Sequence, residues 1–334
     1  MSCKILSFDG GGIRGLITAL LIQNLNQDYN IVEKADGFAG TSTGGLIALG
    51  LASGRSIDEV ITIYKERGEE IFQSNSSLLE DESKQSILDP TGELFSGPGF
   101  FSCQYTNAGL KKIAEELLGD AVLNDVKKLL VVNSARLWNG CSWVPSALSN
   151  RNEYKDIKMV DAALATSAAP TYFPPYPIGR LGFFADGGTF ANNPSVTAIS
   201  EALLETDIQN IRVLSLGTGE IPEGIQPAAL GASGRDPLRW GVTSWMWPLT
   251  WTSGGTQVPA TALLNLTLDL TAEVASLQAK QILKDNYCRG NFALQNPIAL
   301  DDWQRVPELI NATQLYLQSP EWQVIRQWVK VNWT

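Results

Sequence analysis

The segment Gly40-Thr-Ser-Thr-Gly44 joins the end of one predicted strand directly to the start of a predicted helix. It matches Gly-x-Ser-x-Gly, the pattern of a strained strand-to-helix turn that exposes a nucleophilic serine. The small apolar residues from 45 to 52 predict a helix packed inside a sheet structure. The structural alternative is that Ser42 only caps a glycine-rich helix start. The chain contains no histidine, so a catalytic Ser42 would need a carboxylate as its base.

A second strand, glycine turn and helix lie at the N-terminus. Residues 4 to 8 read as a buried strand, and residues 14 to 27 as a mostly apolar helix. Between them, Gly10-Gly-Gly-Ile-Arg-Gly15 fits the Gly-x-Gly-x-x-Gly fingerprint of a dinucleotide site. Two features count against that interpretation. Asp9 would lie beside the pyrophosphate, and the next strand ends in the serine motif instead of an acid for the ribose.

The same glycines also suit a different anion. Consecutive backbone N–H groups at Gly10, Gly11 and Gly12 can converge on one point, and the following helix start adds positive dipole. Beside a nucleophilic serine, such donors form an oxyanion hole for the tetrahedral intermediate of acyl transfer. Arg14 would support the negative charge, or would form a surface salt bridge. A tight turn that merely requires glycine is the structural alternative, although three in a row exceed that need.

Three aspartates followed by glycine are candidates for the base of Ser42. Asp36 precedes the serine along one extended segment, which would put it roughly 15–20 Å away. Asp9 ends the first strand and more plausibly braces the glycine loop. Asp186 ends another apolar strand, and the carboxyl ends of parallel strands meet at one edge of a sheet. We therefore predict a pair in which Ser42 attacks and a buried Asp186, with a raised pKa, accepts the proton.

Strands alternate with helices along most of the chain. This order predicts one α/β domain over residues 1 to 334 with a mostly parallel sheet. Leucines and a valine at spacings of three and four predict a long helix over residues 263 to 277. Further helices are expected within residues 305 to 334. The polar segment 74 to 104, which is rich in Gly and Pro, is expected to form a loop or a lid.

The composition narrows the classes of function. Hydrophobic residues make up 44% and charged residues 18% of the chain, which predicts a globule with a substantial core. The net charge of -10 disfavours binding to nucleic acid polymers and electrostatic docking on anionic membranes. The four cysteines form no Cys-x-x-Cys pair, so we expect reduced thiols, no metal site and a cytoplasmic location. Neither a membrane-spanning segment nor a signal peptide is expected.

A tryptophan-rich stretch follows residue 238. It carries Trp240, Trp245, Trp247 and Trp251, and Arg239 is the only charged residue between positions 238 and 268. Because tryptophan favours membrane–water interfaces, we expect these side chains to line an acyl pocket or to contact a lipid surface. Ordinary packing in a core is the structural alternative.

Taken together, the motifs resemble the patatin-like phospholipase family over roughly residues 4 to 290. The resemblance is carried by Asp9-Gly-Gly-Gly-Ile-Arg-Gly15, Gly40-Thr-Ser-Thr-Gly-Gly45, the run from 165 to 174, Asp186-Gly-Gly188, Asn192-Asn-Pro194 and Ser215-Leu-Gly-Thr-Gly219. It implies a three-layer α/β/α fold and hydrolysis of acyl esters in phospholipids or galactolipids, without metal or cofactor. It also implies Ser42 as nucleophile, Asp186 as base and Gly10 to Gly12 as oxyanion donors.

The leading hypothesis is therefore a serine lipid acyl hydrolase that contacts membranes transiently. Two alternatives stay open at this point: an oxidoreductase that binds a nucleotide at the glycine loop, and a noncatalytic lipid-binding protein. The sequence names no regulatory ligand, although some bacterial relatives of this kind respond to cyclic nucleotides.

Overall fold

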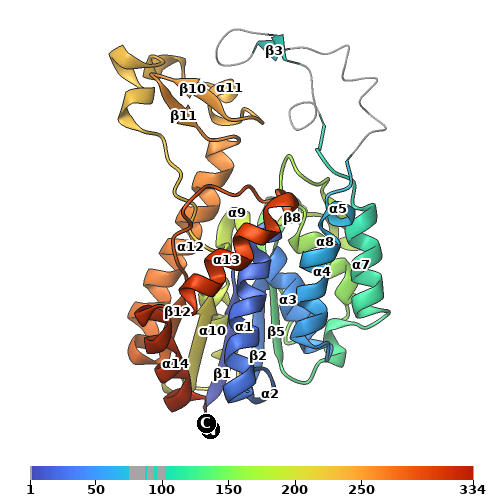
Figure 1. Cartoon of the computed structure of the whole chain (residues 1–334). Coiled ribbons are helices and arrows are strands. Elements are labelled where there is room, and N and C mark those ends of the chain that lie inside the picture. Colours follow the sequence, from blue (N-terminus) through green and yellow to red (C-terminus); the bar gives the residue numbers. More distant parts are fainter. Residues whose placement is uncertain (1, 75–86, 89–93, 96–101, 334) are drawn as a thin grey trace.

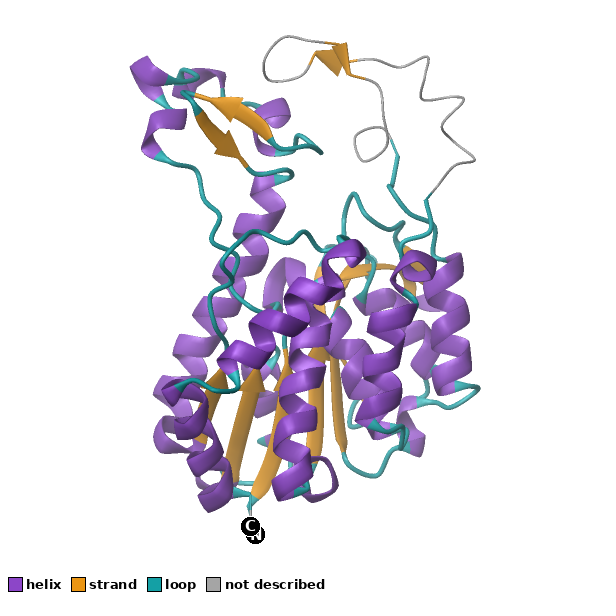
Figure 2. Ribbon diagram, in the orientation of Figure 1, coloured by secondary structure: helices purple, strands orange, loops and turns teal. Residues whose placement is uncertain are grey.

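A computed structural model describes residues 2–74, 87–88, 94–95 and 102–333. A central eight-stranded sheet runs through it with helices on both sides (Figures 1 and 2). In spatial order the strands are β12 (Tyr287–Gly290), β9 (Ile211–Leu216), β1 (Cys3–Phe8), β2 (Gly37–Thr41), β5 (Leu129–Arg136), β8 (Gly182–Asp186) and β7 (Tyr176–Ile178), and β6 (Val144–Ser149) also pairs with β5.

The centre of the sheet is parallel. The strands β12, β9, β1, β2 and β5 all run in the same direction, whereas β6, β7 and β8 are antiparallel to their neighbours. Side chains alternate between two hydrophobic cores, with Leu6 and Phe8 in one and Ile5 in the other. A strand with apolar residues on both faces must be covered on both faces. The prediction of a three-layer α/β/α fold with a mostly parallel sheet is confirmed.

Helices cover the two faces of this sheet, apart from Val242–Trp245, which lies in a unit beyond the sheet. They are α1 (Gly15–Tyr29), α2 (Ile31–Lys34), α3 (Thr43–Ala52), α4 (Ile57–Glu66), α5 (Gly68–Ile71), α7 (Ala108–Leu118), α8 (Met159–Thr166), α9 (Gly188–Ala191), α10 (Ser195–Ala202), α11 (Val242–Trp245), α12 (Ala262–Leu283), α13 (Val306–Tyr316) and α14 (Pro320–Asn332). The larger core lies under α1, α3 and α8, and the smaller core lies under α10 and the end of α12. The helices expected within 305 to 334 are α13 and α14.

The strand that carries Asp186 runs in the opposite direction to the one that the sequence predicted. Strand β8 is antiparallel to β5, so the argument from parallel carboxyl ends was wrong for this strand. Strand β2 pairs with residues 129 to 133 of β5, and β8 pairs with residues 134 to 136 on the same side, because β6 occupies the other side. The two strands therefore point their carboxyl ends at each other, and Ser42 and Asp186 meet there.

Helix α12 is a long helix, as its leucine spacing predicted, but that stripe does not face the core. Leu263, Leu266, Leu270, Val274 and Leu277 are 44 to 63% exposed. The buried side of the helix is built mainly from small residues, including Ala272, Ala275 and Ala279. Small residues allow the helix to lie close to the smaller core, while the large apolar side chains point outward.

A small unit precedes α12 and projects beyond the sheet (Figure 1). It contains α11 and the hairpin of β10 (Trp251–Ser253) and β11 (Thr256–Val258). The loop or lid was expected over residues 74 to 104, and most of that segment lies outside the described residues. Its described part includes a short antiparallel pair of strands, β3 (Ile87–Leu88) and β4 (Leu94–Phe95). No helix in the described part of the chain combines the length and the apolar character required to span a membrane.

Candidate active site

Ser42 occupies a strained turn between β2 and α3. Its φ of 53° and ψ of -123° lie in a region that residues other than glycine rarely adopt. A Cβ at position 40 would lie 2.1 Å from the Gly44 carbonyl oxygen, and one at position 44 would lie 2.1 Å from the Phe8 carbonyl oxygen. The glycines of the motif are therefore required by close backbone packing. The Ser42 side chain makes no helix-cap hydrogen bond, which removes the structural alternative for this residue.

Two neighbouring segments hold the turn in place. The Ser42 amide donates to Thr166 Oγ1 over 2.8 Å, and the Thr166 hydroxyl donates to the Asn133 carbonyl oxygen over 2.5 Å. Thr166 ends α8 and Asn133 lies on β5. The motif at 40 to 44 gave no sign of these contacts; the only related signal is that Thr166 belongs to the run from 165 to 174 named above. They anchor the strained backbone to the sheet.

Asp186 is the carboxylate beside Ser42. It is only 3% exposed, its Oδ1 accepts a hydrogen bond from the Gly188 amide over 2.7 Å, and it lines the same cavity as Ser42. Burial raises the pKa of Asp186 to about 6, partly offset by the neighbouring Ser42 hydroxyl and the Gly188 amide. Asp36 lies at the opposite end of β2, where it accepts a hydrogen bond from the Lys4 amide. The structure thus brings Ser42 together with Asp186 and keeps Asp36 away.

The glycine loop leaves two of its amides unpaired among the described residues, beside the cavity of Ser42. The Gly10 amide is already used, since it donates to the Asn192 carbonyl oxygen over 3.0 Å, and the Ile13 amide donates to Leu300. The amides of Gly11 and Gly12 have no hydrogen-bond partner among the described residues, and both residues line the cavity above Ser42. Two amides of the loop, those of Gly11 and Gly12, are therefore free to bind an oxyanion. The Gly10 amide fixes the loop to Asn192 and is not available for this role.

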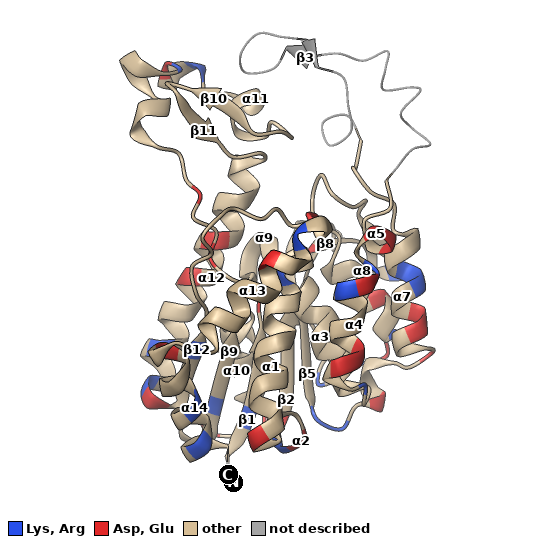
Figure 3. Ribbon diagram, viewed as in Figure 1, with Lys and Arg blue, Asp and Glu red and all other residues tan. Residues whose placement is uncertain are grey.

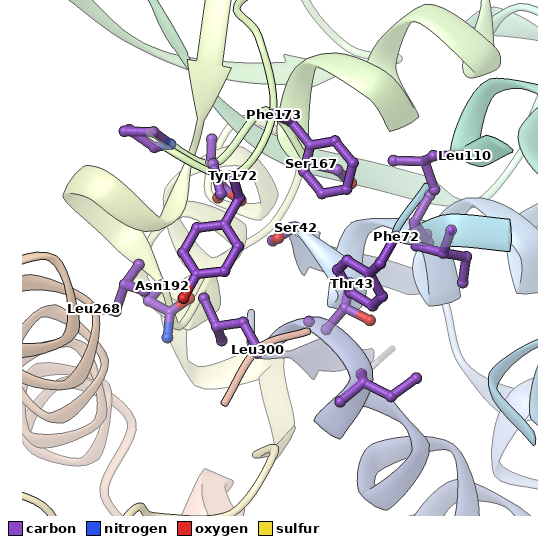
Figure 4. Close-up of a pocket in the computed structure, with 18 of the residues that line it drawn as sticks. Ser42, Thr43, Phe72, Leu110, Ser167, Tyr172, Phe173, Asn192, Leu268 and Leu300 are labelled. Atoms are coloured by element: carbon purple, nitrogen blue, oxygen red, sulfur yellow. The ribbon is translucent and has the colours of Figure 1, made fainter. Parts of the chain in front are cut away.

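The cavity above Ser42 is predominantly apolar (Figure 4). Its walls carry large hydrophobic side chains from several elements, among them Phe72, Leu110, Tyr172, Phe173, Leu268 and Leu300. Ser42 and Asp186 also line it, whereas the tryptophans after residue 238 do not. A hydrophobic chain placed in this cavity would bring an ester at its end close to the serine hydroxyl.

Arg14 lies on the other side of the glycine loop. Its guanidinium donates to the carbonyl oxygens of Gly11 (3.4 Å) and Gly219 (3.3 Å), and it lines a second cavity from which Ser42 is absent. This placement differs from the prediction that Arg14 contacts the oxyanion, because the helix start turns the side chain away from the serine. Burial lowers the pKa of the Arg14 guanidinium.

Asp9 braces the loop through a partner that no local motif indicated. Its Oδ2 accepts a hydrogen bond from Arg289 Nη2 over 2.6 Å, and Arg289 lies on β12, two strands away from β1. The Asp9 side chain is almost fully buried, so this ion pair compensates a charge beneath the glycines. The residues are 280 positions apart in the chain, which is why sequence analysis missed the pair.

The four tryptophans pack together in the small unit that projects beyond the sheet. Trp240 contacts Trp245 and Trp251 with ring centroids 5.2 and 5.7 Å apart, and Trp247 and Trp251 are buried. They form a core for the hairpin of β10 and β11. Lining of the acyl pocket by these side chains was predicted but is not observed, because they stabilise their own unit.

Within the residues that the structure describes, no group of three or more Cys, Asp or Glu side chains is arranged to hold a metal ion. The glycine loop, which also fitted a dinucleotide fingerprint, borders the cavity of Ser42 instead of a nucleotide cleft flanked by a ribose-binding acid. The geometry defines an α/β protein with a serine turn and a buried carboxylate at the edge of a parallel sheet.

Comparison with known proteins agrees with this class. The model of the patatin-like phospholipase family matches residues 6 to 199. The chain is 32% identical to a cGAMP-activated phospholipase of Vibrio cholerae serotype O1, over 72% of this chain and 70% of that protein. A cGAMP-activated phospholipase of Escherichia coli strain TW11681 is 28% identical, over 89% and 82%. Patatin-like protein 1 of Arabidopsis thaliana is 25% identical, over 85% and 73%.

The chain belongs to the patatin-like phospholipase family. It is accordingly a lipid acyl hydrolase in general terms, and the oxidoreductase alternative is set aside.

Proposed function

We propose that this protein cleaves fatty-acyl esters of membrane phospholipids or galactolipids, with Ser42 as nucleophile and Asp186 as general base. The observation that carries the proposal is that the strained Ser42 and the buried carboxylate of Asp186 line the same apolar cavity. The test is to incubate the purified protein with liposomes and to measure released fatty acid, comparing wild type with Ser42→Ala. No release from any lipid or soluble ester by the wild type would contradict the proposal.

In the proposed reaction, Ser42 Oγ attacks the ester carbonyl carbon while its proton moves to Asp186. The carbonyl oxygen becomes an oxyanion that the Gly11 and Gly12 amides bind. Collapse of the intermediate breaks the bond to the alcohol, which leaves with the proton from Asp186, and the acyl group stays on Ser42. Water then attacks the acyl-serine, Asp186 accepts the water proton, and fatty acid is released as the proton returns to Ser42 Oγ.

The raised pKa of Asp186 is the reason a carboxylate can replace an imidazole. An ordinary aspartate, with a pKa of about 3.9, is a weak base towards a serine hydroxyl at neutral pH. Burial brings the Asp186 pKa to about 6, close to the value of about 6.5 for histidine. The Asp186 carboxylate is still mostly ionised at pH 7, so it can accept a proton and is a stronger base than an ordinary aspartate.

Substitution of Gly12 by alanine tests the oxyanion donors. Gly12 has a φ of 57°, and an added Cβ would lie 2.1 Å from the Leu300 carbonyl oxygen, so the loop must shift and its amides with it. We expect the turnover number on a soluble ester to fall about a hundredfold, as for loss of one donor. The matched control is Gly54→Ala, because Gly54 also has a positive φ, 85°, but has no atom near its Cβ position.

Melting temperatures of both variants separate the loss of stability from the loss of oxyanion donors. Both should lose stability, by about 1–2 kcal/mol from the left-handed backbone alone, and Gly12→Ala more because of its contact with Leu300. Equal turnover numbers for Gly12→Ala and Gly54→Ala would contradict the assigned role of the loop.

We also propose transient contact with a membrane through the unit that holds the tryptophans. The tryptophans themselves are mostly buried, but Leu238, Val242 and Leu249 project from this unit and are 94, 70 and 54% exposed. In Figure 3 the unit is largely uncharged apart from its tip. Exposed apolar groups favour insertion into the headgroup region of a bilayer, and the charges of Arg235, Asp236 and Arg239 beside Leu238 would stay at its polar surface.

The double substitution Leu238→Ser and Val242→Ser tests this contact. We expect the ratio of liposome hydrolysis to soluble-ester hydrolysis to fall roughly tenfold or more, because a loss of about 1.4 kcal/mol in membrane binding is tenfold and partial insertion of two apolar side chains contributes at least that much. Leu204→Ser is the matched control, since Leu204 is 70% exposed beyond the end of α10. An unchanged ratio in the double variant, measured on phosphatidylcholine liposomes, would rule out this surface.

We also propose that a regulatory ligand controls the activity. The two bacterial relatives described above are named cGAMP-activated phospholipases. The test is to compare the rate of liposome hydrolysis with and without cGAMP. A serine that reacts with a fluorophosphonate probe in neither condition would contradict the proposed nucleophile.

A further inference from the structure

A second cavity lies beside the cavity of Ser42 along the same edge of the sheet. Asn192 borders both cavities, and the Asn192 and Gly10 backbones are hydrogen-bonded between them. Helix α12 passes over both: Leu264 and Leu268 line the first, whereas Asp269 and Glu273 line the second. The first cavity is apolar and the second is lined mainly by polar and charged groups, so the pair matches the two chemical halves of a phospholipid.

We propose that the second cavity binds the head group of a phospholipid that carries a primary ammonium, with its phosphate at Arg14 and its ammonium at Asp269 and Glu273. This inference rests on the proposed function, since the acyl ester must then lie at Ser42. The shared chemistry is a phosphate diester next to an ammonium group, which either a lipid or a soluble phosphoethanolamine compound could supply.

Arg14 is the reason to place the phosphate at the floor of the cavity. The residue is 4% exposed, and its guanidinium donates only to the carbonyl oxygens of Gly11 and Gly219. It forms no ion pair with any carboxylate in the described part of the chain. The charges of Asp269 and Glu223 act on Arg14 without a direct hydrogen bond, so the buried guanidinium lacks a contacting counter-ion that a bound anion would supply.

The other buried arginine in the cavity is already neutralised. Arg289 donates to Asp9 over 2.6 Å and to Ser215 over 3.0 Å, so it and Asp9 form a closed pair. Arg14 is thereby the guanidinium with unused donor capacity at this floor. Its contact with the Gly11 carbonyl oxygen also places the phosphate next to the glycine loop that borders the cavity of Ser42.

The rim of the cavity carries the opposite charge. Asp269, Glu273 and Glu220 are exposed there, and none of them forms an ion pair with a described residue. Figure 3 shows the acidic positions in the upper half of α12. Negative charge at the rim repels an anionic head group such as glycerol phosphate and attracts an ammonium. Its carboxylates also favour a primary ammonium over choline, because choline has no N–H donor.

The test compares phosphatidylethanolamine, phosphatidylcholine and phosphatidylglycerol with identical acyl chains in detergent micelles. Each rate is divided by the rate of the same protein on a soluble p-nitrophenyl ester. We expect wild type to prefer phosphatidylethanolamine over phosphatidylglycerol by roughly tenfold or more. In the double variant Asp269→Asn, Glu273→Gln this preference should disappear, whereas Asp285→Asn, at an exposed position just after the end of α12, should keep it. Equal rates on all three lipids, or a preference retained in the double variant, would overturn the inference.

A binding measurement separates this inference from the proposed catalysis. Ser42→Ala, which would lack the nucleophile, is titrated calorimetrically with glycerophosphoethanolamine and with inorganic phosphate. Binding of glycerophosphoethanolamine that weakens about tenfold in Arg14→Lys supports the site even if no ester is cleaved. Binding of inorganic phosphate alone, or of glycerophosphoethanolamine without any head-group preference in hydrolysis, would assign the cavity to a soluble ligand and overturn the head-group role.

Discussion

Replacing Ser42 by alanine is expected to lower hydrolysis of both liposomes and a soluble ester by roughly ten-thousandfold or more, because the covalent step is lost. The substitution removes one oxygen from a turn whose shape is set by Gly40, Gly44 and the hydrogen bond from the Ser42 amide to Thr166. We therefore expect the fold to survive and the melting temperature to stay close to that of wild type.

Labelling with a fluorophosphonate probe identifies the reacting serine directly. Wild type should be labelled and Ser42→Ala should not. Ser167 provides the sharpest comparison, since it lines the same cavity but its hydroxyl has no hydrogen-bond partner among the described residues. A serine without a base should not react. Labelling that persists in Ser42→Ala and disappears in Ser167→Ala would transfer the nucleophile to position 167.

Replacing Asp186 by asparagine is expected to reduce the turnover number roughly a thousandfold or more, because an amide cannot accept the serine proton. The pH dependence gives a second signature. The base must be ionised, so kcat/KM of wild type should be constant above pH 7 and fall as the pH drops through about 6, the raised pKa of Asp186. The residual activity of Asp186→Asn should lack this acid limb.

The same variant should be more stable than wild type at neutral pH. A carboxyl group with a higher pKa in the folded than in the unfolded chain stabilises the fold only where it is protonated, and this contribution is lost as the pH rises through the folded pKa. The difference between about 6 and the ordinary 3.8 corresponds to at most about 3 kcal/mol at pH 7.5. Urea denaturation should therefore show a higher free energy of unfolding for Asp186→Asn at pH 7.5.

This advantage should shrink as the pH falls through about 6 and approach zero below about pH 3, where the carboxyl group is protonated in both states. Asp156→Asn, at an exposed position, is the matched control and should show no such trend. A variant that is less stable than wild type at pH 7.5 would show that the hydrogen bonds of Asp186 outweigh its burial. The acid limb at about pH 6 would then also be contradicted.

The local parts of the fold could be predicted from the sequence. The strand, glycine turn and helix around residues 4 to 27, and the serine turn at 40 to 44, depend on backbone shapes that only certain residues allow. The long helix α12 followed from its leucine spacing, but its direction did not. Periodicity shows that a helix has an apolar stripe, and it does not show which side the rest of the protein covers. The prediction of a single domain over residues 1 to 334 stays a prediction.

The candidate site could be predicted only in part, because a motif does not show which way each of its residues faces. Ser42, Asp186, Gly11 and Gly12 were found from motifs and lie together, whereas Gly10 and Arg14 belong to the same motif and face elsewhere. The amide of Gly10 is taken by Asn192, and the guanidinium of Arg14 is held at a second cavity by donating to the carbonyl oxygens of Gly11 and Gly219. Their partners are about 180 or more positions away in the chain, at Asn192 and Gly219, beyond the reach of any local pattern.

What the sequence determined by itself is the chemistry available: a serine in a turn that only glycines at 40 and 44 permit, no imidazole, and carboxylates after apolar strands. Only the tertiary structure decided which carboxylate lies beside that serine. Strand β8 runs antiparallel to β5 and pairs with the part of β5 just beyond the end of β2, on the same side, so that Asp186 lies next to Ser42. Strand direction and pairing depend on hydrogen bonds between distant segments, and a residue pattern along one segment does not contain them.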